Sequence, residues 1–242
     1  MKWYENWFDS KYYHTLYKHR NHNEAEKFIN NIILKLNIKK DQKIIDVCCG
    51  KGRHANYLSK LKFDITGIDL SKNNIEFAKK NNLNNLNFFV HDMRSVFKKN
   101  HFDIVINLFT SLGYFDKLED EEKAINSMIN NLKNEGVIII DFLNVKKTIT
   151  DLVSKENKII ENICFSLSRK VNKDYIIKNI KITDQKKSLY FCEKVRLLTL
   201  NNFKIMLKKS NAKIIDLYGD YSLNSFDEDK SNRLIIVAKK IK

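Results

Sequence analysis

The stretch DVCCGKGRH, residues 46–54, joins a β-branched apolar run, KIIDVC at 43–48, to a segment of helical period, RHANYLSKL at 53–61. This order predicts a buried strand, a glycine-containing turn and a helix. Glycine is needed where the backbone takes a positive φ or where a ligand approaches too closely for a Cβ, and Gly50 and Gly52 meet that need. The amides at the start of the following helix favour an anionic group nearby. The stretch therefore predicts a turn that binds a small, polar ligand.

Strands and helices alternate on both sides of this turn. Apolar runs predict further strands at 63–69, 86–90, 102–109, 137–142, 213–219 and 233–240. Apolar residues at helical spacing predict helices at 24–36, 72–81, 120–133, near 144–154 and at 201–210. Ser71 fits the N-cap of the helix at 72–81, and Gly136 fits the C-terminal turn of the helix at 120–133.

This alternation is typical of a doubly wound α/β fold, in which helices cover both faces of a mostly parallel sheet. The last two predicted strands are joined by a turn or loop and not by a helix. We therefore predict a Rossmann-like sheet of seven strands, mostly parallel, with a reversed last strand.

Residues 157–199 do not follow this alternation of strands and helices. Three stretches that alternate apolar with polar residues follow one another without helices between them, namely KIIENICFSLSRKV, YIIKNIKITD and SLYFCEKVRLLT. They predict a small three-stranded antiparallel insertion with one exposed face. Because no proline- or glycine-rich linker interrupts the chain, we predict one domain over 1–242 that carries this insertion and an aromatic arm at 1–23. The arm is expected to pack as a lid over the site.

The composition sets limits on the class of protein. The chain has 242 residues, a net charge of +15 and 43% hydrophobic residues, which is enough apolar side chain to exclude a disordered protein. The basic residues are scattered, which is more typical of a solvated surface than of a nucleic-acid stripe. The four cysteines form no spaced metal framework, no signal peptide is visible at the start, and no stretch is long enough to span a bilayer. These features predict a cytoplasmic protein with no membrane partner and no metal.

Carboxylates follow two of the neighbouring strands. Asp69 ends the second predicted strand, where it can accept both hydroxyl protons of a ribose. Asp92 and Met93 follow the third strand, where an adenine amino group and ring could lie. Asp46 precedes the glycine turn, as expected of a group that orients an amino-acid moiety. The run GKGRHA also fits the dinucleotide fingerprint, which leaves a nicotinamide-dependent oxidoreductase open.

At this point the sequence resembles the class I S-adenosylmethionine-dependent methyltransferases. The resemblance covers almost the whole chain through DVCCGKG (46–52), GIDLS (67–71), HDMR (91–94), NLFTSLGYF (107–115) and NEGVIIIDF (134–142). The chain is most similar to small-molecule enzymes of the bacterial amino-sugar N-methyltransferase type, which share an N-terminal Tyr and Arg segment, an F-[ST]-S-x-G-Y loop and a late antiparallel insertion. Cys48 departs from the family, which more often has Gly or Ala there.

The resemblance implies S-adenosylmethionine as the cofactor. It places Gly50 and Gly52 against the methionyl part, Asp69 on the ribose hydroxyls, and Asp92 with Met93 at the adenine. The full cofactor set that it implies is Tyr17, Arg20, Asp46, Cys48, Gly50, Gly52, Asp69, Leu70, Asp92, Met93, Asn107 and Leu108. Tyr17 and Arg20 match positions that help hold the cofactor carboxylate, which an Arg fork suits geometrically.

The chemistry of methyl transfer places few demands on side chains. Transfer from a sulfonium is an in-line displacement, so the enzyme contributes chiefly by holding the nucleophile close to the methyl carbon, and a base is needed only if the nucleophile carries a proton. Polar groups at the carboxyl edge of the sheet are the candidates: Thr110, Ser111, Tyr114, Asp141, Asn144, Asp220 and Tyr221. Of these, we expect Tyr114 and Asp141 to orient the substrate.

These observations predict a methyltransferase that acts on a nitrogen or oxygen of a small-molecule acceptor, with the arm and the 157–199 insertion covering the acceptor. A tRNA or rRNA methyltransferase of the same fold is the first alternative, because the pI is near 9.5. The nicotinamide-dependent oxidoreductase is the second, and a catalytically silent partner subunit is the third. A homodimer that exchanges N-terminal arms is compatible with activity or with silence.

Overall fold

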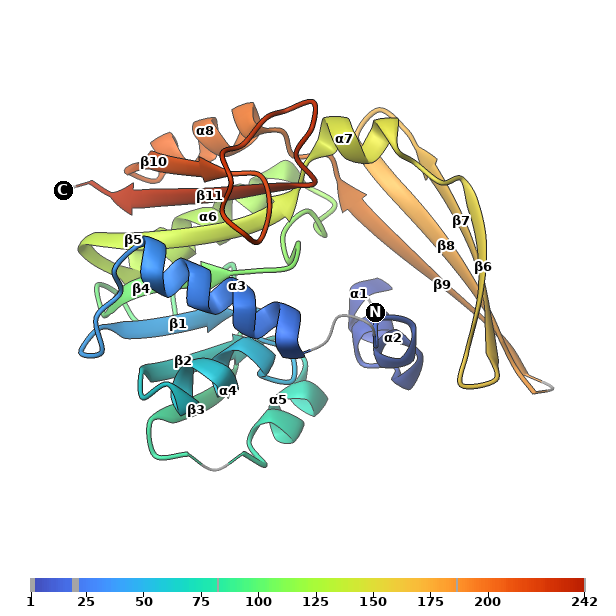
Figure 1. The fold of residues 1–242 in the computed structure, drawn as a ribbon, viewed down its shortest axis with the longest axis horizontal. Coiled ribbons are helices and arrows are strands. Elements are labelled where there is room, and N and C mark those ends of the chain that lie inside the picture. Colours follow the sequence, from blue (N-terminus) through green and yellow to red (C-terminus); the bar gives the residue numbers. More distant parts are fainter. Residues whose placement is uncertain (1–2, 19–21, 82, 186, 242) are drawn as a thin grey trace.

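The protein folds around a seven-stranded sheet with the order β10-β11-β5-β4-β1-β2-β3 (Figure 1). The computed structural model describes residues 3–18, 22–81, 83–185 and 187–241. The strands are β1 (Lys43–Val47), β2 (Asp64–Asp69), β3 (Leu86–Val90), β4 (Phe102–Asn107), β5 (Leu132–Leu143), β10 (Ala212–Tyr218) and β11 (Arg233–Lys240). All neighbouring pairs from β5 to β3 are parallel, and β11 runs antiparallel to both β5 and β10. The predicted fold, with its reversed last strand, is confirmed.

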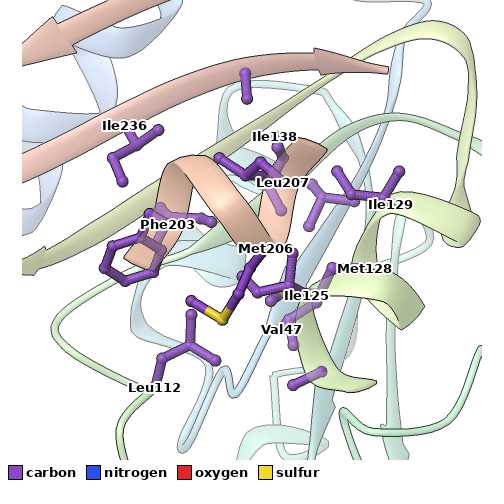
Figure 2. Close-up of a cluster of buried hydrophobic side chains, with 14 of the residues drawn as sticks. Val47, Leu112, Ile125, Met128, Ile129, Ile138, Phe203, Met206, Leu207 and Ile236 are labelled. Carbon is purple, nitrogen blue, oxygen red and sulfur yellow. The ribbon is translucent and has the colours of Figure 1, made fainter. Parts of the chain in front are cut away.

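Helices cover both faces of this sheet, which explains the continuous apolar runs of its central strands. They are α3 (His22–Lys35), α4 (Arg53–Lys60), α5 (Lys72–Ala78), α6 (Leu118–Asn131) and α8 (Leu200–Lys209). Successive residues of β5 point to opposite faces, so that Ile138 and Ile140 pack in the core under α6 and α8, whereas Ile139 packs in the core under α3 and α4. Figure 2 shows the first of these cores, where Met206 and Leu207 of α8 meet side chains of α6 and of the sheet.

The turn expected at Gly136 is not a helix terminus. Helix α6 ends at Asn131 and β5 starts at once, so Gly136 lies inside the strand, and the positive φ of +65° falls on Glu135. A Cβ on Gly136 would lie 3.0 Å from the carbonyl oxygen of Asp103. The glycine is therefore needed for the close approach of the β4 backbone, and the prediction of a helix cap was wrong.

The second sheet has four antiparallel strands, not three. They are β6 (Lys155–Ile160), β7 (Ile163–Val171), β8 (Tyr175–Asp184) and β9 (Lys187–Arg196), and helix α7 (Val145–Thr150) leads into them from β5. The missed turn lies at Glu161 and Asn162, which both take a positive φ, as a two-residue hairpin turn requires. Since this turn holds no glycine, the sequence does not separate β6 from β7.

The N-terminal arm consists of α1 (Trp3–Phe8) and α2 (Lys11–Leu16) and lies between the two sheets (Figure 1). Its apolar side chains, among them Trp7 and Leu16, form a third core with the second sheet, which contributes Phe165 and Ile180. None of the helices within the described ranges combines the length and apolar character needed to cross a membrane.

Candidate active site

A cavity of about 1000 Å³ lies at the carboxyl ends of β1 to β4. Its sheet side is formed by the turn after β1 and by the residues that follow β2, β3 and β4, because parallel strands end at a common edge. Its other side is formed by the arm, which contributes Tyr4, Phe8, Tyr13, His14, Tyr17 and Lys18. The cavity is thus enclosed between the sheet edge and an aromatic segment.

The turn after β1 has three residues in the left-handed region: Cys48 at φ +63°, Gly50 at +54° and Gly52 at +79°. Gly50 lines the cavity, and a Cβ on it would meet no atom within 4 Å, so the space above it is open. Gly52 does not line the cavity, and a Cβ there would lie 2.6 Å from Cζ of Phe88. One glycine leaves room for a ligand, and the other leaves room for a core side chain.

Three predicted carboxylates reach the cavity. Asp46 is buried, and its Oδ2 has no hydrogen-bond partner among the described residues. Burial, together with the charge of Asp69, raises the pKa of Asp46 to about 8. Asp69 accepts the N–H of Gly50 at 2.8 Å and that of Ser71 at 2.9 Å, while burial raises its pKa. These two bonds fix the orientation of the Asp69 carboxylate at the end of β2.

Asp92 and its neighbours form the next part of the wall. The Asp92 carboxylate accepts the backbone N–H of Arg94 at 2.9 Å and its Nε at 3.0 and 3.1 Å. Sδ of Met93 lies 3.5 Å from Sγ of Cys48, and both residues line the cavity with Leu70. Burial raises the pKa of the Cys48 thiol well above its usual value, so this thiol is protonated and is no nucleophile.

The loop that follows β4, residues 108–115, forms the wall between the sheet edge and the arm. Leu108, Phe109, Ser111, Tyr114 and Phe115 line the cavity. The Tyr114 ring packs against the rings of Trp3 and Phe8, with centroids 5.3 Å from each, and its hydroxyl donates to the carbonyl of Thr110. This side chain therefore joins the loop to the arm.

Several predicted site residues lie elsewhere. Asp141 is fully buried and outside the cavity lining, where its carboxylate accepts the N–H of Phe109 at 2.9 Å and Nε of Arg233 at 2.7 Å. Asn107 is also fully buried, and its Nδ2 donates to the carbonyl of Val47 at 3.0 Å. Thr110, Asn144, Asp220 and Tyr221 are likewise absent from the lining.

Of the two arm residues expected at the cofactor carboxylate, the structure describes only Tyr17. Tyr17 lines the cavity, but its hydroxyl donates to Glu193 at 2.7 Å and accepts from Nζ of Lys178 at 2.6 Å, so it points to the second sheet. Arg20 lies outside the described residues.

The sequence reasoning missed residues on helices. His14 lines the cavity, and burial with the charge of Lys51 lowers its pKa to about 4. Glu121 of α6 is buried behind the 108–115 loop, where burial raises its pKa to about 7. The available signal was helical spacing, because Glu121 lies on the same stripe as the buried Ala124, Ile125 and Met128.

Comparison with known proteins finds methyltransferases among the matched domain, the curated relatives and the solved structures. Residues 44–136 match the family described as "Methyltransferase domain". The chain is 25% identical over 163 residues to the dTDP-3-amino-3,4,6-trideoxy-alpha-D-glucopyranose N,N-dimethyltransferase of Streptomyces venezuelae, covering 65% of this chain and 68% of that protein. It is 29% identical over 146 residues to the ubiquinone biosynthesis O-methyltransferase of Rickettsia typhi, covering 59% and 57%.

Solved structures share the fold over nearly the whole chain. An S-adenosylmethionine-dependent methyltransferase from Clostridium acetobutylicum superimposes with a TM-score of 0.79 at 19% identity, covering 95% of this chain and 96% of the other. An amino pentose methyltransferase from Micromonospora echinaspora, solved with S-adenosylmethionine bound, gives a TM-score of 0.72 at 16% identity, covering 96% and 97%. The matched domain, the solved structures and the sheet order identify residues 44–136 as a methyltransferase domain within a chain that has the fold of the S-adenosylmethionine-dependent methyltransferases.

Proposed function

We propose that this protein transfers a methyl group from S-adenosylmethionine to a nitrogen or oxygen of a small-molecule acceptor, and that the amine of an amino sugar is the first acceptor to test. The observation that carries the proposal is the convergence of Asp46, Asp69 and Asp92 on one cavity that an aromatic arm covers. The amine is favoured because the Streptomyces relative and the Micromonospora structure are both named for methylation of amino sugars.

The residues present fit the cofactor. Asp46 offers a buried carboxylate oxygen without a partner among the described residues, which suits the α-ammonium group of a methionyl moiety. The open space above Gly50 would admit the methionyl chain, Asp69 would accept the ribose hydroxyls, and Asp92 with Met93 would adjoin the adenine. The cofactor, when bound, supplies an electrophilic methyl group on a sulfonium.

The chain itself contributes orientation and exclusion of water. Tyr4 and Phe8 of the arm pack with Tyr114 into one aromatic cluster, so an acceptor bound between this cluster and the sheet edge would be removed from bulk solvent. Holding a neutral amine near contact with the methyl carbon can contribute about 7–11 kcal/mol to catalysis. Tyr114 stays our candidate for orienting the acceptor. We assign Asp141 to the support of the 108–115 loop, because it bonds Phe109 and Arg233 outside the cavity.

We propose in addition that the enzyme is cytoplasmic. All four cysteines, Cys48, Cys49, Cys164 and Cys192, are free thiols. Free thiols support a reducing, cytoplasmic setting for the enzyme.

The test is formation of S-adenosylhomocysteine by the purified chain with S-adenosylmethionine and a panel of acceptors. The panel contains amino-sugar nucleotides, catechol-type phenols and bulk tRNA, and products are identified by mass spectrometry. We expect an amino-sugar nucleotide methylated on its amine as the product. Turnover of tRNA alone, or of no acceptor, would contradict the proposal.

Cofactor binding is tested separately by calorimetry. Asp69→Ala should abolish measurable binding of S-adenosylmethionine, because the ribose loses its acceptor while the strand is retained. Asp64→Ala is the matched control, since Asp64 is exposed at the other end of the same strand. Equal affinities for the two variants would remove Asp69 from the site.

A further inference from the structure

The 108–115 loop holds a backbone that it would not adopt unaided. Phe109 and Thr110 both take φ of +59°, and Gly113 takes +88°. Left-handed conformations of non-glycine residues cost about 1–2 kcal/mol each, so such a backbone persists only where surrounding groups fix it. Since five residues of this loop line the cavity, the groups that fix it also determine the shape of the cavity.

Two buried carboxylates fix the loop at its two ends. Asp141 accepts the N–H of Phe109 at 2.9 Å at the start of the loop. Glu121 accepts the N–H of Gly113 at 3.0 Å through Oε2 and that of Phe115 at 3.1 Å through Oε1. Both oxygens of Glu121 thus accept backbone N–H groups of the two residues that flank Tyr114.

Burying a carboxylate at this place costs folding free energy, and the packing of the surrounding core does not require a charged side chain. Glu121 is fully buried on the stripe of α6 that packs in the first core, where an apolar side chain would be the ordinary choice. It does not line the cavity, so it touches neither cofactor nor acceptor. Its two bonds to the loop are what distinguish it from an apolar residue.

The segment that Glu121 holds touches several parts of the site. The Tyr114 ring packs on Phe8 of the arm, and the Phe115 ring lies 4.9 Å from the guanidinium carbon of Arg94, which pairs with Asp92. A displacement of the two residues that flank Tyr114 would therefore move side chains on the acceptor side of the cavity. Asp46 and Asp69, which belong to β1 and β2, would stay in place.

We propose that Glu121 is a positioning residue for methyl transfer: its carboxylate fixes the two N–H groups that flank Tyr114 and so places Tyr114 and Phe115 against the acceptor. This inference rests on the proposed function. It concerns the acceptor side of the cavity and leaves the methionyl and ribose parts of the cofactor to Asp46 and Asp69.

The test compares Glu121→Gln with Glu122→Gln. Glutamine keeps the shape of Glu121 but offers one acceptor oxygen to two N–H groups. Glu122, its neighbour on α6, instead pairs with Lys209 of α8 at 2.7 Å at the surface. For Glu121→Gln we expect kcat/KM for the acceptor to fall about 100-fold, the effect of a small misplacement in a closed site. Its Kd for S-adenosylmethionine should change less than about threefold, and Glu122→Gln should match the wild type in both.

Hydrogen exchange of the 108–117 segment gives a readout that needs no acceptor. We expect this segment to exchange faster in Glu121→Gln while β4 and β5 keep their protection. Unchanged exchange in the segment, or an unchanged kcat/KM, would overturn the proposal. If wild-type protein turns over no acceptor, the proposed function fails, and the exchange result alone then supports or overturns the anchoring by Glu121.

The Glu121→Asp variant tests whether Glu121 is needed only for folding. It keeps the charge and both oxygens but retracts them by one methylene, so we expect a kcat/KM between those of wild type and Glu121→Gln. A Glu121→Asp enzyme with wild-type kcat/KM and a disordered Glu121→Gln protein would together show a merely structural role.

Discussion

Gly50 and Gly52 have the same backbone handedness and stand two residues apart, yet the structure gives them different tasks. Gly50 faces open space in the cavity, whereas the hydrogen of Gly52 faces the Phe88 ring. Substitution of Gly52 should therefore lower stability, whereas substitution of Gly50 should weaken ligand binding.

Gly52→Ala should lower the free energy of unfolding by about 2–4 kcal/mol, because strain at positive φ adds to overpacking against Phe88. Gly50→Ala should cost about 1–2 kcal/mol for its φ alone and should weaken binding of S-adenosylmethionine, since the methyl group would enter the cavity. Urea unfolding and calorimetric titration measure the two effects. Equal stability losses with equal affinities would contradict this division.

His54 should make stability depend on pH. Burial, with the charge of Arg53, lowers its pKa to about 3, and its ring packs 5.2 Å from that of Phe109. Because the folded state disfavours the charged form, this contribution is fully present above about pH 6.5 and is lost as pH falls toward 3. Unfolding free energies measured between pH 7 and pH 4 should fall less steeply for His54→Asn than for wild type. Parallel curves for the two proteins would contradict the assignment.

The residues that the sequence located were those tied to strand ends. Asp46 is the penultimate residue of β1, Asp69 is the last residue of β2, and Asp92 follows β3 by two residues. Parallel strands deliver such residues to one edge. The direction of a side chain near a strand end was not predictable, so the sequence did not reveal that the Asp141 carboxylate bonds Phe109 and Arg233 outside the cavity lining. Its partner Arg233 lies 92 positions away along the chain, in a strand that pairs with β5.

At the scale of elements, one side chain of β9 accepts hydrogen bonds from two residues of the arm. Glu193 accepts Nε1–H of Trp7 at 2.7 Å and the hydroxyl of Tyr17 at 2.7 Å, and it lies 3.5 Å from Nζ of Lys178. The arm also contacts helix α5, where Asp9 accepts a hydrogen bond from Nδ2 of Asn73 at 3.1 Å. Both elements were predicted, but their contact was not, because the partners come from opposite ends of the sequence.

Glu193→Ala should release the arm, since it leaves two donors and an ammonium group without their shared acceptor. We expect a cost to arm docking of about 2–3 kcal/mol and faster tryptic cleavage after Lys11 and Lys18. Glu161→Ala is the control, because Glu161 forms an exposed ion pair with Lys18, and such pairs contribute little. Equal cleavage of the two variants would show that apolar packing alone holds the arm.

At the scale of the whole molecule, the fold contains two packing units. The seven-stranded sheet has a core on each face, whereas the arm shares a separate, smaller core with the second sheet. The two units meet where the N–H of Arg196 donates to the carbonyl of Gly113 at 2.7 Å and where Leu198 enters the first core. The different periodicities of the sequence predicted the two sheets, the second with three strands in place of four.

Native-state hydrogen exchange should resolve these units. We expect amides of β7 and β8 to exchange through openings at lower denaturant than amides of β4 and β5, because less apolar area holds the second unit together. A common denaturant dependence for all four strands would show that the molecule opens only as a whole.

The third core, finally, has a consequence for biosynthesis. Trp7 and Leu16 leave the ribosome early, but their partners Phe165 and Ile180 are translated about 150 residues later, long after the strands that bear the carboxylates. During translation the arm therefore cannot pack until β7 and β8 have been synthesised, and β10 and β11 complete the first sheet only after that.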